Sequence, residues 1–280
     1  LSIEDDKQMA QRFPVLHLIL GGHDHQHMEF KVGNTVITKA DANAKTVYIH
    51  RITHDWKKQK TFIESALKKI DDKIPHDPDT EAIVQKWLTF AYGKLESSGY
   101  RPREVIYRTD EKLDGLEYSV RHRATNLTKL IIEAAKSVFP QADGVILNGG
   151  AIRLDDILTG EITQEDILRT MPFGDGLVLV RVQGDILLKT LEIGSTLNIG
   201  TGGFLHHGNI EKQDNQWCIA GKPISETQTY LITTSRFLSS GKERNLDFFN
   251  FPDAYCPEKI GEIRNDVRDI LIHFLKSKKI

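Results

Sequence analysis

Residues 125–150 read TNLTKLIIEAAKSVFPQADGVILNGG, a helix pattern that runs directly into a strand pattern. The first part spaces its apolar residues three and four apart, with Thr125 as a candidate N-cap and Pro140 as a stop, which predicts an amphipathic helix. The second part, residues 142–150, is a short apolar run ending in two glycines, which predicts a buried strand followed by a tight turn. A helix joined to a buried strand favours a sheet covered by helices.

The same alternation continues to the end of the chain. The mixed order of elements predicts an α+β or mixed α/β fold from about residue 100 onward. A capping box formed by Thr163 and Asp166 should begin the first of the further helices. Helices are predicted at 163–172, 184–197 and 264–279, and strands at 176–184 and within 229–241.

The N-terminal part carries mainly strand patterns, at residues 15–22, 34–40 and 45–53. A charged, proline-containing stretch follows up to residue 80, and residues 80–99 then show helical spacing. We therefore expect three parts: a first domain over residues 1–78, a linker helix over 79–99 and a second domain over 100–280.

Charge and cysteine content exclude several classes of protein. The 37 basic and 39 acidic residues nearly balance, which gives no electrostatic case for binding a nucleic-acid polymer or a membrane surface. No apolar run approaches the roughly 20 residues of a membrane span. Cys218 and Cys256 are too few for a disulfide framework or a zinc ribbon, although a single bridge stays open.

Residues 18–30, LILGGHDHQHMEF, look like a buried strand that opens into a metal-binding loop. The two glycines free the chain to turn, so His23 and His25 can face one metal ion or two. Surface histidines in a polar turn are the alternative, since a metal site needs further ligands.

Five stretches together resemble a known family. GGHDHQ at 21–26 resembles the last metal-ligand block of the calcineurin-like metallophosphoesterases. The others resemble, in order, the C-terminal domain of bacterial and animal 5′-nucleotidases. These are ATNLTKLIIEA at 124–134, DGVILNGGAIR at 143–153, MPFGDGLVLVRVQG at 171–184 and GTGGFL at 200–205. The resemblance implies the end of a metallophosphoesterase β-sandwich domain, a connecting helix and a 5′-nucleotidase C-terminal substrate-binding domain.

By this resemblance, His23 would bind one divalent ion and His25 another, with Zn, Mn, Mg or Ca as candidate metals. Paired ions polarise phosphoryl oxygens and activate a bridging water for attack on phosphorus. The family's Asp-x-His and Asn-His ligand blocks have no match, because no histidine follows an asparagine or has an aspartate two places before it. We therefore expect the remaining ligands and the catalytic residues outside this chain, which alone should not hydrolyse nucleotides.

The resemblance also implies a nucleotide-binding site in the second domain. Phe173 and Phe237 would stack on the two faces of a base, although a phenylalanine after a strand is more often a core residue. Arg123 and Arg153 would face the phosphate or the ribose, because guanidinium groups suit such oxygens. Asn148, with Gly150, would present a polar edge and open backbone to the base.

One departure from the family bears on the substrate. The Gly-Gly-Asp-Gly stretch of relatives appears here as GKER at 241–244, so Glu243 would take the place of the ribose-binding aspartate. A longer carboxylate can still accept two hydroxyl hydrogen bonds, or it can point to solvent. The identity of the nucleotide therefore stays open.

Three functions fit these patterns. The first is the nucleotide-recognition part of a two-metal phosphohydrolase that converts 5′-nucleotides to nucleosides and phosphate. The second is a non-catalytic nucleotide-binding module, and the third is a relative acting on cyclic nucleotides or nucleotide sugars. Many family members are exported, so we expect a periplasmic or cell-surface location, with the cytoplasm as the alternative; the oligomeric state stays open.

Overall fold

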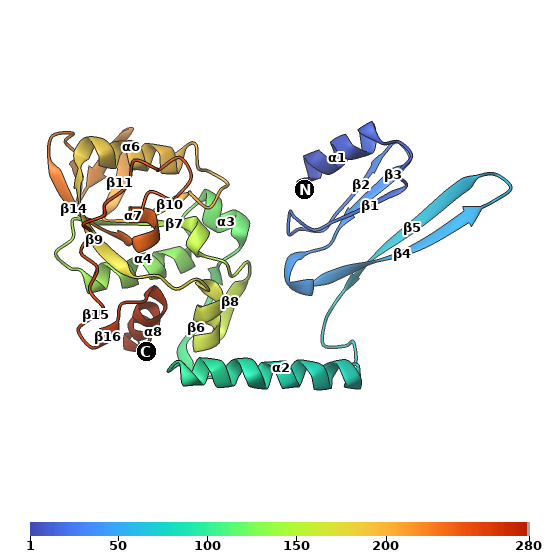
Figure 1. Cartoon of the computed structure of the whole chain (residues 1–280), viewed down its shortest axis with the longest axis horizontal. Coiled ribbons are helices and arrows are strands. Elements are labelled where there is room, and N and C mark those ends of the chain that lie inside the picture. The colour runs from blue at the N-terminus through green and yellow to red at the C-terminus, as the bar shows by residue number, and fades with distance from the viewer. Residues whose placement is uncertain (279–280) are drawn as a thin grey trace. The chain divides into compact units, whose positions relative to one another are not determined.

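The computed structural model describes residues 1–278, and the chain divides into two compact units, Leu1–Leu88 and Thr89–Ile280 (Figure 1). The last residue of the predicted helix at 264–279 lies outside the described part. Helices and strands occur in both units, so the predicted mixed α/β class is confirmed. None of the helices in residues 1–278 has the length and apolar character that a membrane crossing requires.

The N-terminal unit contains a three-stranded sheet. Strand β1 (Leu18–Gly21) pairs in parallel with β3 (Thr35–Lys39), which pairs antiparallel with β2 (Met28–Val32). Helix α1 (Ile3–Arg12) packs on all three strands and begins at a capping box between Ser2 and Asp5. This helix is absent from the sequence-based prediction. The 3-10 turn η1 (Ala42–Ala44) follows the sheet.

A long antiparallel ribbon completes the N-terminal unit. It pairs β4 (Thr46–Asp55) with β5 (Lys60–Lys69) along their whole length. The sequence predicts only a charged stretch over residues 54–80 and no strand, whereas residues 60–69 form β5. Along residues 60–66 exposed positions alternate with less exposed ones, which is the two-residue period of a half-covered strand. Helix α2 (Pro78–Ser97) then spans the boundary of the two units, and Gly99, with a φ of +89°, follows its end.

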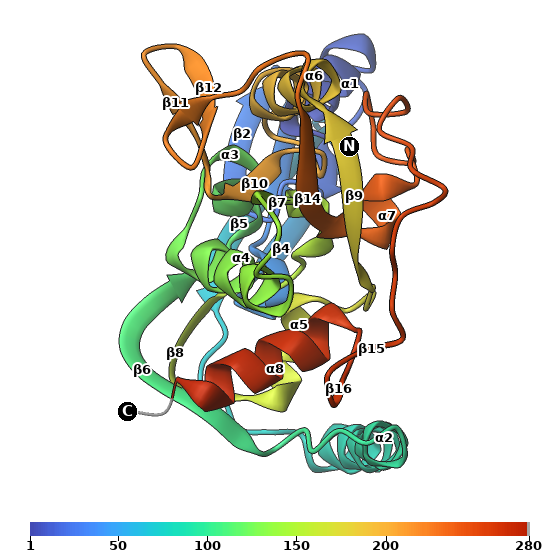
Figure 2. The ribbon, with the colours of Figure 1, turned by 90° about the vertical axis from the view of Figure 1, so that its left-hand side faces the viewer.

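The C-terminal unit is built on a four-stranded mixed sheet. The strand order is β10-β7-β14-β9, with β14 parallel to β7 and the other neighbours antiparallel. Figure 2 shows this sheet between helix α6 (Gly184–Ser195) and helix α4 (Asn126–Val138). The four strands are β7 (Gly144–Asn148), β9 (Leu177–Gln183), β10 (Leu205–Gly208) and β14 (Thr229–Ser235).

Two hydrophobic cores cover the two faces of this sheet. Along β7, Val145 and Leu147 pack into one core with α4, whereas Ile146 packs into the other core with α6. This alternation follows from the two-residue period of a strand and explains why β7 is apolar throughout. The helices on these faces are α4 (Asn126–Val138) and α8 (Val267–Ser277) on one side and α6 (Gly184–Ser195) on the other.

Local sequence signals set several of these elements. Thr125 caps α4 and Thr163 caps α5 (Gln164–Thr170), both through capping boxes, which confirms both predicted helix starts. Residues 229–241 were predicted as a strand that runs into a loop. In the structure, Ser235 instead caps a one-turn helix after the strand, α7 (Arg236–Ser239). Cys218 and Cys256 are both free thiols, so the bridge left open by the sequence is not formed.

The remaining elements surround the sheet. They are β6 (Val105–Asp114) paired with β8 (Ile157–Thr163), α3 (Glu117–His122), the 3-10 turn η2 (Gly149–Ala151), α5 (Gln164–Thr170), the small sheet of β11 (Ile210–Gln213), β12 (Gln216–Ile219) and β13 (Lys222–Pro223), and the pair β15 (Lys259–Ile260) and β16 (Ile263–Arg264).

One edge of the four-stranded sheet gathers the ends of all four strands. The register pairs Asn148, the last residue of β7, with Leu205, the first of β10. It also pairs Ser235, the last residue of β14, with Leu177, the first of β9. The segments that leave or enter these four strands therefore meet at the same edge.

Candidate functional site

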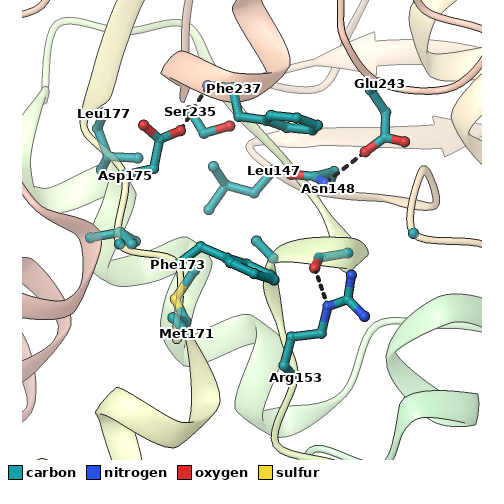
Figure 3. A pocket seen from close by; sticks show the side chains of 15 residues that line it. Leu147, Asn148, Arg153, Met171, Phe173, Asp175, Leu177, Ser235, Phe237 and Glu243 are labelled. Atoms are coloured by element: carbon teal, nitrogen blue, oxygen red, sulfur yellow. Dashed lines mark hydrogen bonds between the residues drawn. The ribbon is translucent and has the colours of Figure 1, made fainter.

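A cavity of about 550 Å³ lies at this edge, within the C-terminal unit (Figure 3). Its volume falls within the range of small-molecule sites. Six of the seven residues predicted to bind substrate line it. They are Asn148, Gly150, Arg153, Phe173, Phe237 and Glu243.

Two phenylalanine rings form opposite walls of the cavity, as Figure 3 shows. Phe173 is 70% exposed and Phe237 is 43% exposed, so both rings are open to a ligand in the cavity. Between the walls the floor is apolar and includes Leu147 and Met171. The arrangement leaves a flat, apolar slot with an aromatic face on each side.

The loop that carries Phe173 depends on a glycine at position 174. Gly174 has a φ of +57°, and a Cβ atom there would lie 2.1 Å from the Arg268 guanidinium. That guanidinium is itself held by Asp266, through Nε to Oδ1 at 2.9 Å and Nη2 to Oδ2 at 2.6 Å. Its hydrogen bonds to Asp266 keep the pKa of Arg268 above its ordinary value, against the effect of burial. The loop therefore packs closely on a fixed, charged partner.

A carboxylate that the sequence reasoning missed lies at one end of the slot. Asp175 lines the cavity and accepts a hydrogen bond from the Phe237 backbone N–H at 2.7 Å. In the sequence, the Gly174-Asp175 pair could be compared only with the family's Gly-Asp metal-ligand block, which gave Asp175 no role at this cavity. The 62-residue separation of Asp175 from Phe237 explains why no local signal indicated this contact.

A polar pair lies at the other end. The Asn148 Nδ2 group donates to Glu243 Oε2 at 2.7 Å, and Glu243 Oε1 accepts from the Arg244 N–H at 2.9 Å. Because a carboxylate can only accept, the amide must turn its NH₂ group toward Glu243. Asn148 Oδ1 is buried and has no partner within residues 1–278, so an unused acceptor lies beside the cavity.

Gly150 allows two backbone segments to approach each other at the cavity. Its N–H donates to the Gly202 carbonyl at 2.7 Å, and a Cβ atom on Gly150 would lie 3.0 Å from the Gly202 Cα. Side chains at both positions would push the segments apart. The glycine of GTGGFL at position 202 thus contributes to the same wall.

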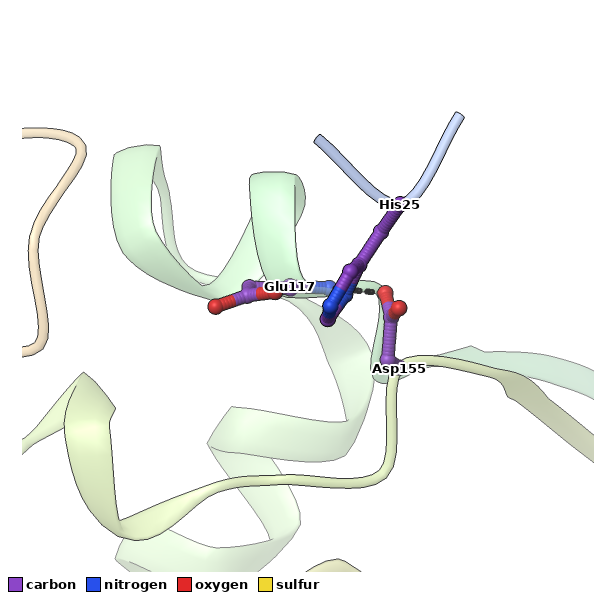
Figure 4. A group of neighbouring side chains, drawn as sticks. All are labelled: His25, Glu117 and Asp155. Atoms are coloured by element: carbon purple, nitrogen blue, oxygen red, sulfur yellow. Dashed lines mark hydrogen bonds between the residues drawn. The ribbon is translucent and has the colours of Figure 1, made fainter. Parts of the chain in front are cut away.

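Arg153 lies beside Phe173, at the mouth of the cavity. Its Nε donates to the Gly150 carbonyl at 2.8 Å, and its guanidinium carbon lies 5.4 Å from the Phe173 ring centroid. The turn that follows is fastened to α3, because the Glu117 N–H donates to Asp155 Oδ1 at 2.9 Å (Figure 4). These bonds fix the segment from which the arginine projects.

Arg123 does not line the cavity. Its Nη2 donates to Ser119 Oγ at 3.0 Å and lies 3.4 Å from Asp114 Oδ2, and its side chain is 61% exposed. The structure therefore separates it from the six residues that the cavity brings together. Its expected contact with phosphate stays a prediction.

His23 and His25 lie in the N-terminal unit, on the loop between β1 and β2, and both are exposed. A fully buried lysine supports this loop: Lys39 Nζ lies 2.7 Å from Asp6 Oδ2 and pairs with Asp24, the residue between the two histidines. Burial alone would lower the pKa of Lys39, but its hydrogen bonds to the two carboxylates raise it. Within residues 1–88, no third histidine, cysteine or carboxylate joins the two histidines closely enough to complete a metal site.

The chain is similar in sequence to 5′-nucleotidases. Protein UshA of Yersinia enterocolitica is 32% identical over 135 residues, which cover 46% of this chain and 24% of UshA. Human 5′-nucleotidase is 28% identical over 240 residues, which cover 74% of this chain and 40% of that protein. The chain thus spans well under half of the length of these relatives.

Solved structures of low identity share the fold. The 5′-nucleotidase precursor of Thermus thermophilus superposes with a TM-score of 0.69 at 19% identity, over 93% of this chain and 56% of that one. The sulfate thiohydrolase SoxB of the same species superposes with a TM-score of 0.65 at 18% identity, over 97% of this chain and 49% of that one. Residues 105–250, just over half of the chain, match the family described as the 5′-nucleotidase C-terminal domain. The six cavity residues predicted from sequence all fall within that match, and the chain belongs to this family.

Proposed function

We propose that the C-terminal unit binds the nucleoside part of a 5′-nucleotide in this cavity. It would act as the recognition part of a two-metal phosphohydrolase that converts a 5′-nucleotide and water to a nucleoside and phosphate. The observation that carries the proposal is the pair of exposed phenylalanine rings on opposite walls of one cavity. A planar base fits between such rings, and each stacking contact contributes about 1–3 kcal/mol.

The polar end of the cavity suits a ribose next to the base. Glu243 keeps lone pairs beyond those used by Asn148 and Arg244, and a carboxylate can accept hydrogen bonds from two neighbouring hydroxyls. Asn148 lines the same end and would present its polar edge to the base.

The phosphate would meet arginine at the mouth of the cavity. The fixed Arg153 guanidinium presents N–H groups in a fork that matches phosphate oxygens. Arg123 is a second candidate, since its side chain is 61% exposed and its tip makes one contact of 3.0 Å and one of 3.4 Å.

His23 and His25 would each supply one imidazole to a pair of divalent ions. Imidazole suits Zn, whereas Mn, Mg and Ca prefer oxygen ligands. The ion pair between buried Lys39 and half-buried Asp24 holds the loop that carries the two rings. When bound, such ions polarise the phosphoryl oxygens and generate the attacking hydroxide. Because two imidazoles do not complete such a site, we expect no hydrolysis by this chain alone. Export to the periplasm or the cell surface is part of the proposal.

Calorimetric titration with adenosine, AMP and UDP-glucose tests the proposal. Phe173→Ala and Phe237→Ala should each weaken adenosine binding about tenfold or more, since tenfold corresponds to about 1.4 kcal/mol and one stack supplies about that much. Tyr255→Ala is the matched control, because it removes a 62% exposed ring that does not line the cavity.

Two outcomes would count against the proposal. One is the absence of saturable binding at millimolar adenosine and AMP, and the other is unchanged binding by both phenylalanine variants. Tighter binding of UDP-glucose than of AMP would instead favour a relative that acts on nucleotide sugars.

A further inference from the structure

Asp175 connects the two aromatic walls of the cavity. It follows Phe173 by two residues, yet its Oδ2 accepts the Phe237 N–H from the opposite wall at 2.7 Å (Figure 3). Its Oδ1 accepts from the Gly176 N–H at 2.9 Å and from Arg236 Nε at 3.3 Å. A single carboxylate therefore ties the loop of one ring to the helix of the other.

Backbone hydrogen bonds also hold the loop that carries this carboxylate. The Asp175 carbonyl accepts from the Val267 N–H at 2.9 Å, and the Gly176 carbonyl accepts from the Arg236 N–H at 2.9 Å. Gly174 packs directly on Arg268. The Phe173 loop therefore cannot shift without breaking contacts to both α7 and α8.

The Phe237 wall, by contrast, rests on a short element. Helix α7 has four residues, and Phe237 is its second. The N–H groups of a helix's first turn have no acceptor within the helix, so the Phe237 N–H depends on an acceptor from elsewhere. Asp175 supplies it, while the Ser235 Oγ accepts the Leu238 N–H at 3.0 Å.

We propose that Asp175 is a positioning residue that fixes the separation of the Phe173 and Phe237 rings and keeps the slot ready for one planar ring. The inference rests on the proposed function, because it concerns the same site. Without the carboxylate, α7 loses a tie to the Phe173 loop and the Phe237 ring gains freedom. Ligand binding must then order that wall, which lowers the affinity.

A double-mutant cycle separates this role from a general effect on folding. Adenosine affinity is measured by calorimetry for the wild-type chain, Asp175→Ala, Phe237→Ala and the double variant. Asp175→Ala should weaken binding about tenfold in the wild-type background and less than about twofold in the Phe237→Ala background, because it acts through that ring. Asp175→Asn, which keeps one acceptor oxygen, should recover most of the affinity.

The matched control is Asp185→Ala. Asp185 also follows a glycine and accepts a local backbone N–H, from Ile186 at 2.7 Å, but it does not line the cavity. This variant should bind adenosine within about twofold of the wild type. A second readout needs no ligand: the Phe237 amide proton should exchange with solvent at least about tenfold faster in Asp175→Ala than in the wild type.

The outcomes distinguish the two proposals. Equal losses from Asp175→Ala in both backgrounds, or an unchanged Phe237 amide exchange rate, would overturn the positioning role alone. If the wild-type chain bound no nucleoside, the proposed function would fail, and the positioning role would fail with it as a role in binding.

Discussion

The C-terminal unit should lose stability in mild acid because of one buried histidine. His206 on β10 is 3% exposed, and its Nε2 lies 2.8 Å from the Val120 carbonyl, which requires a proton on Nε2. Its Nδ1 is buried and has no partner within residues 1–278. Protonation of Nδ1 would create a buried charge without an acceptor. Burial therefore lowers the pKa of His206 to about 4.

The direction and size of the effect follow from this shift. The unfolded chain takes up the proton near pH 6.5, whereas the folded chain takes it up only near pH 4. Stability is therefore complete above pH 6.5 and falls as the pH drops from 6.5 toward 4. Between about pH 7 and pH 5 the loss from this group is about 2 kcal/mol in the free energy of unfolding.

Tryptophan fluorescence can follow this loss. Trp217 is 8% exposed in the C-terminal unit, whereas Trp56 and Trp87 are 78% and 60% exposed, so unfolding of that unit should dominate the change in emission. Urea unfolding at pH 7 and pH 5 is compared for the wild-type chain and His206→Gln. The variant should lose about 2 kcal/mol less than the wild type between the two pH values, whatever its stability at pH 7.

His273→Gln, which removes an exposed histidine on α8, is the control and should keep the wild-type loss. Partial burial also lowers the pKa of His207, which is present in both members of the main comparison. Equal losses in the wild type and His206→Gln would refute the reasoning. It would mean that His206 becomes protonated in the folded unit without penalty.

Three further predictions concern other parts of the chain. Lys39→Met should destabilise the N-terminal unit by about 3–5 kcal/mol, because it leaves the buried Asp6 and half-buried Asp24 carboxylates without their cation. Hydrogen exchange of β3 reports this loss, exposed Lys31→Met is the control, and unchanged exchange would contradict the prediction. Gly174→Ala should weaken adenosine binding about tenfold or more in calorimetry, because the added Cβ atom would clash with Arg268. Gly160→Ala is the control and should not weaken binding, since Gly160 also has a positive φ but no atom lies within 4 Å of its added Cβ. Equal effects of the two changes would rule out the clash with Arg268. His23→Ala, or added chelator, should leave adenosine affinity within about twofold, and a larger loss would show that metal ligation contributes to nucleoside binding.

Local sequence signals carried much of the fold prediction. The capping boxes at Thr125 and Thr163 are encoded within three residues, and the apolar run of β7 needs only the two-residue period of a strand. β5 was missed because its lysine and glutamate residues resemble a connector, although its pairing with β4 covers alternate positions. α7 was missed because a single helical turn is too short to show a period.

For the candidate site as well, the residues in local motifs could be predicted, but the contacts between distant residues could not. Motif order indicated six residues that line the cavity, among them Phe173 and Phe237. The partners that hold them were not predictable, because the contact between Asn148 and Glu243 spans 95 residues and depends on the assembled sheet edge. The same applies to Lys39, because its two carboxylate partners lie 33 and 15 residues away along the chain.

The meeting of four strand ends at one sheet edge has an evolutionary consequence. The apolar residues of the four strands pack into two hydrophobic cores, so substitutions there would destabilise the domain. The loops that join the strands contribute less to these cores and tolerate substitutions better. The GKER segment at 241–244 belongs to such a loop and supplies Glu243 to the cavity. New ligand preferences can therefore arise through a few codon changes in these loops while the inherited framework persists.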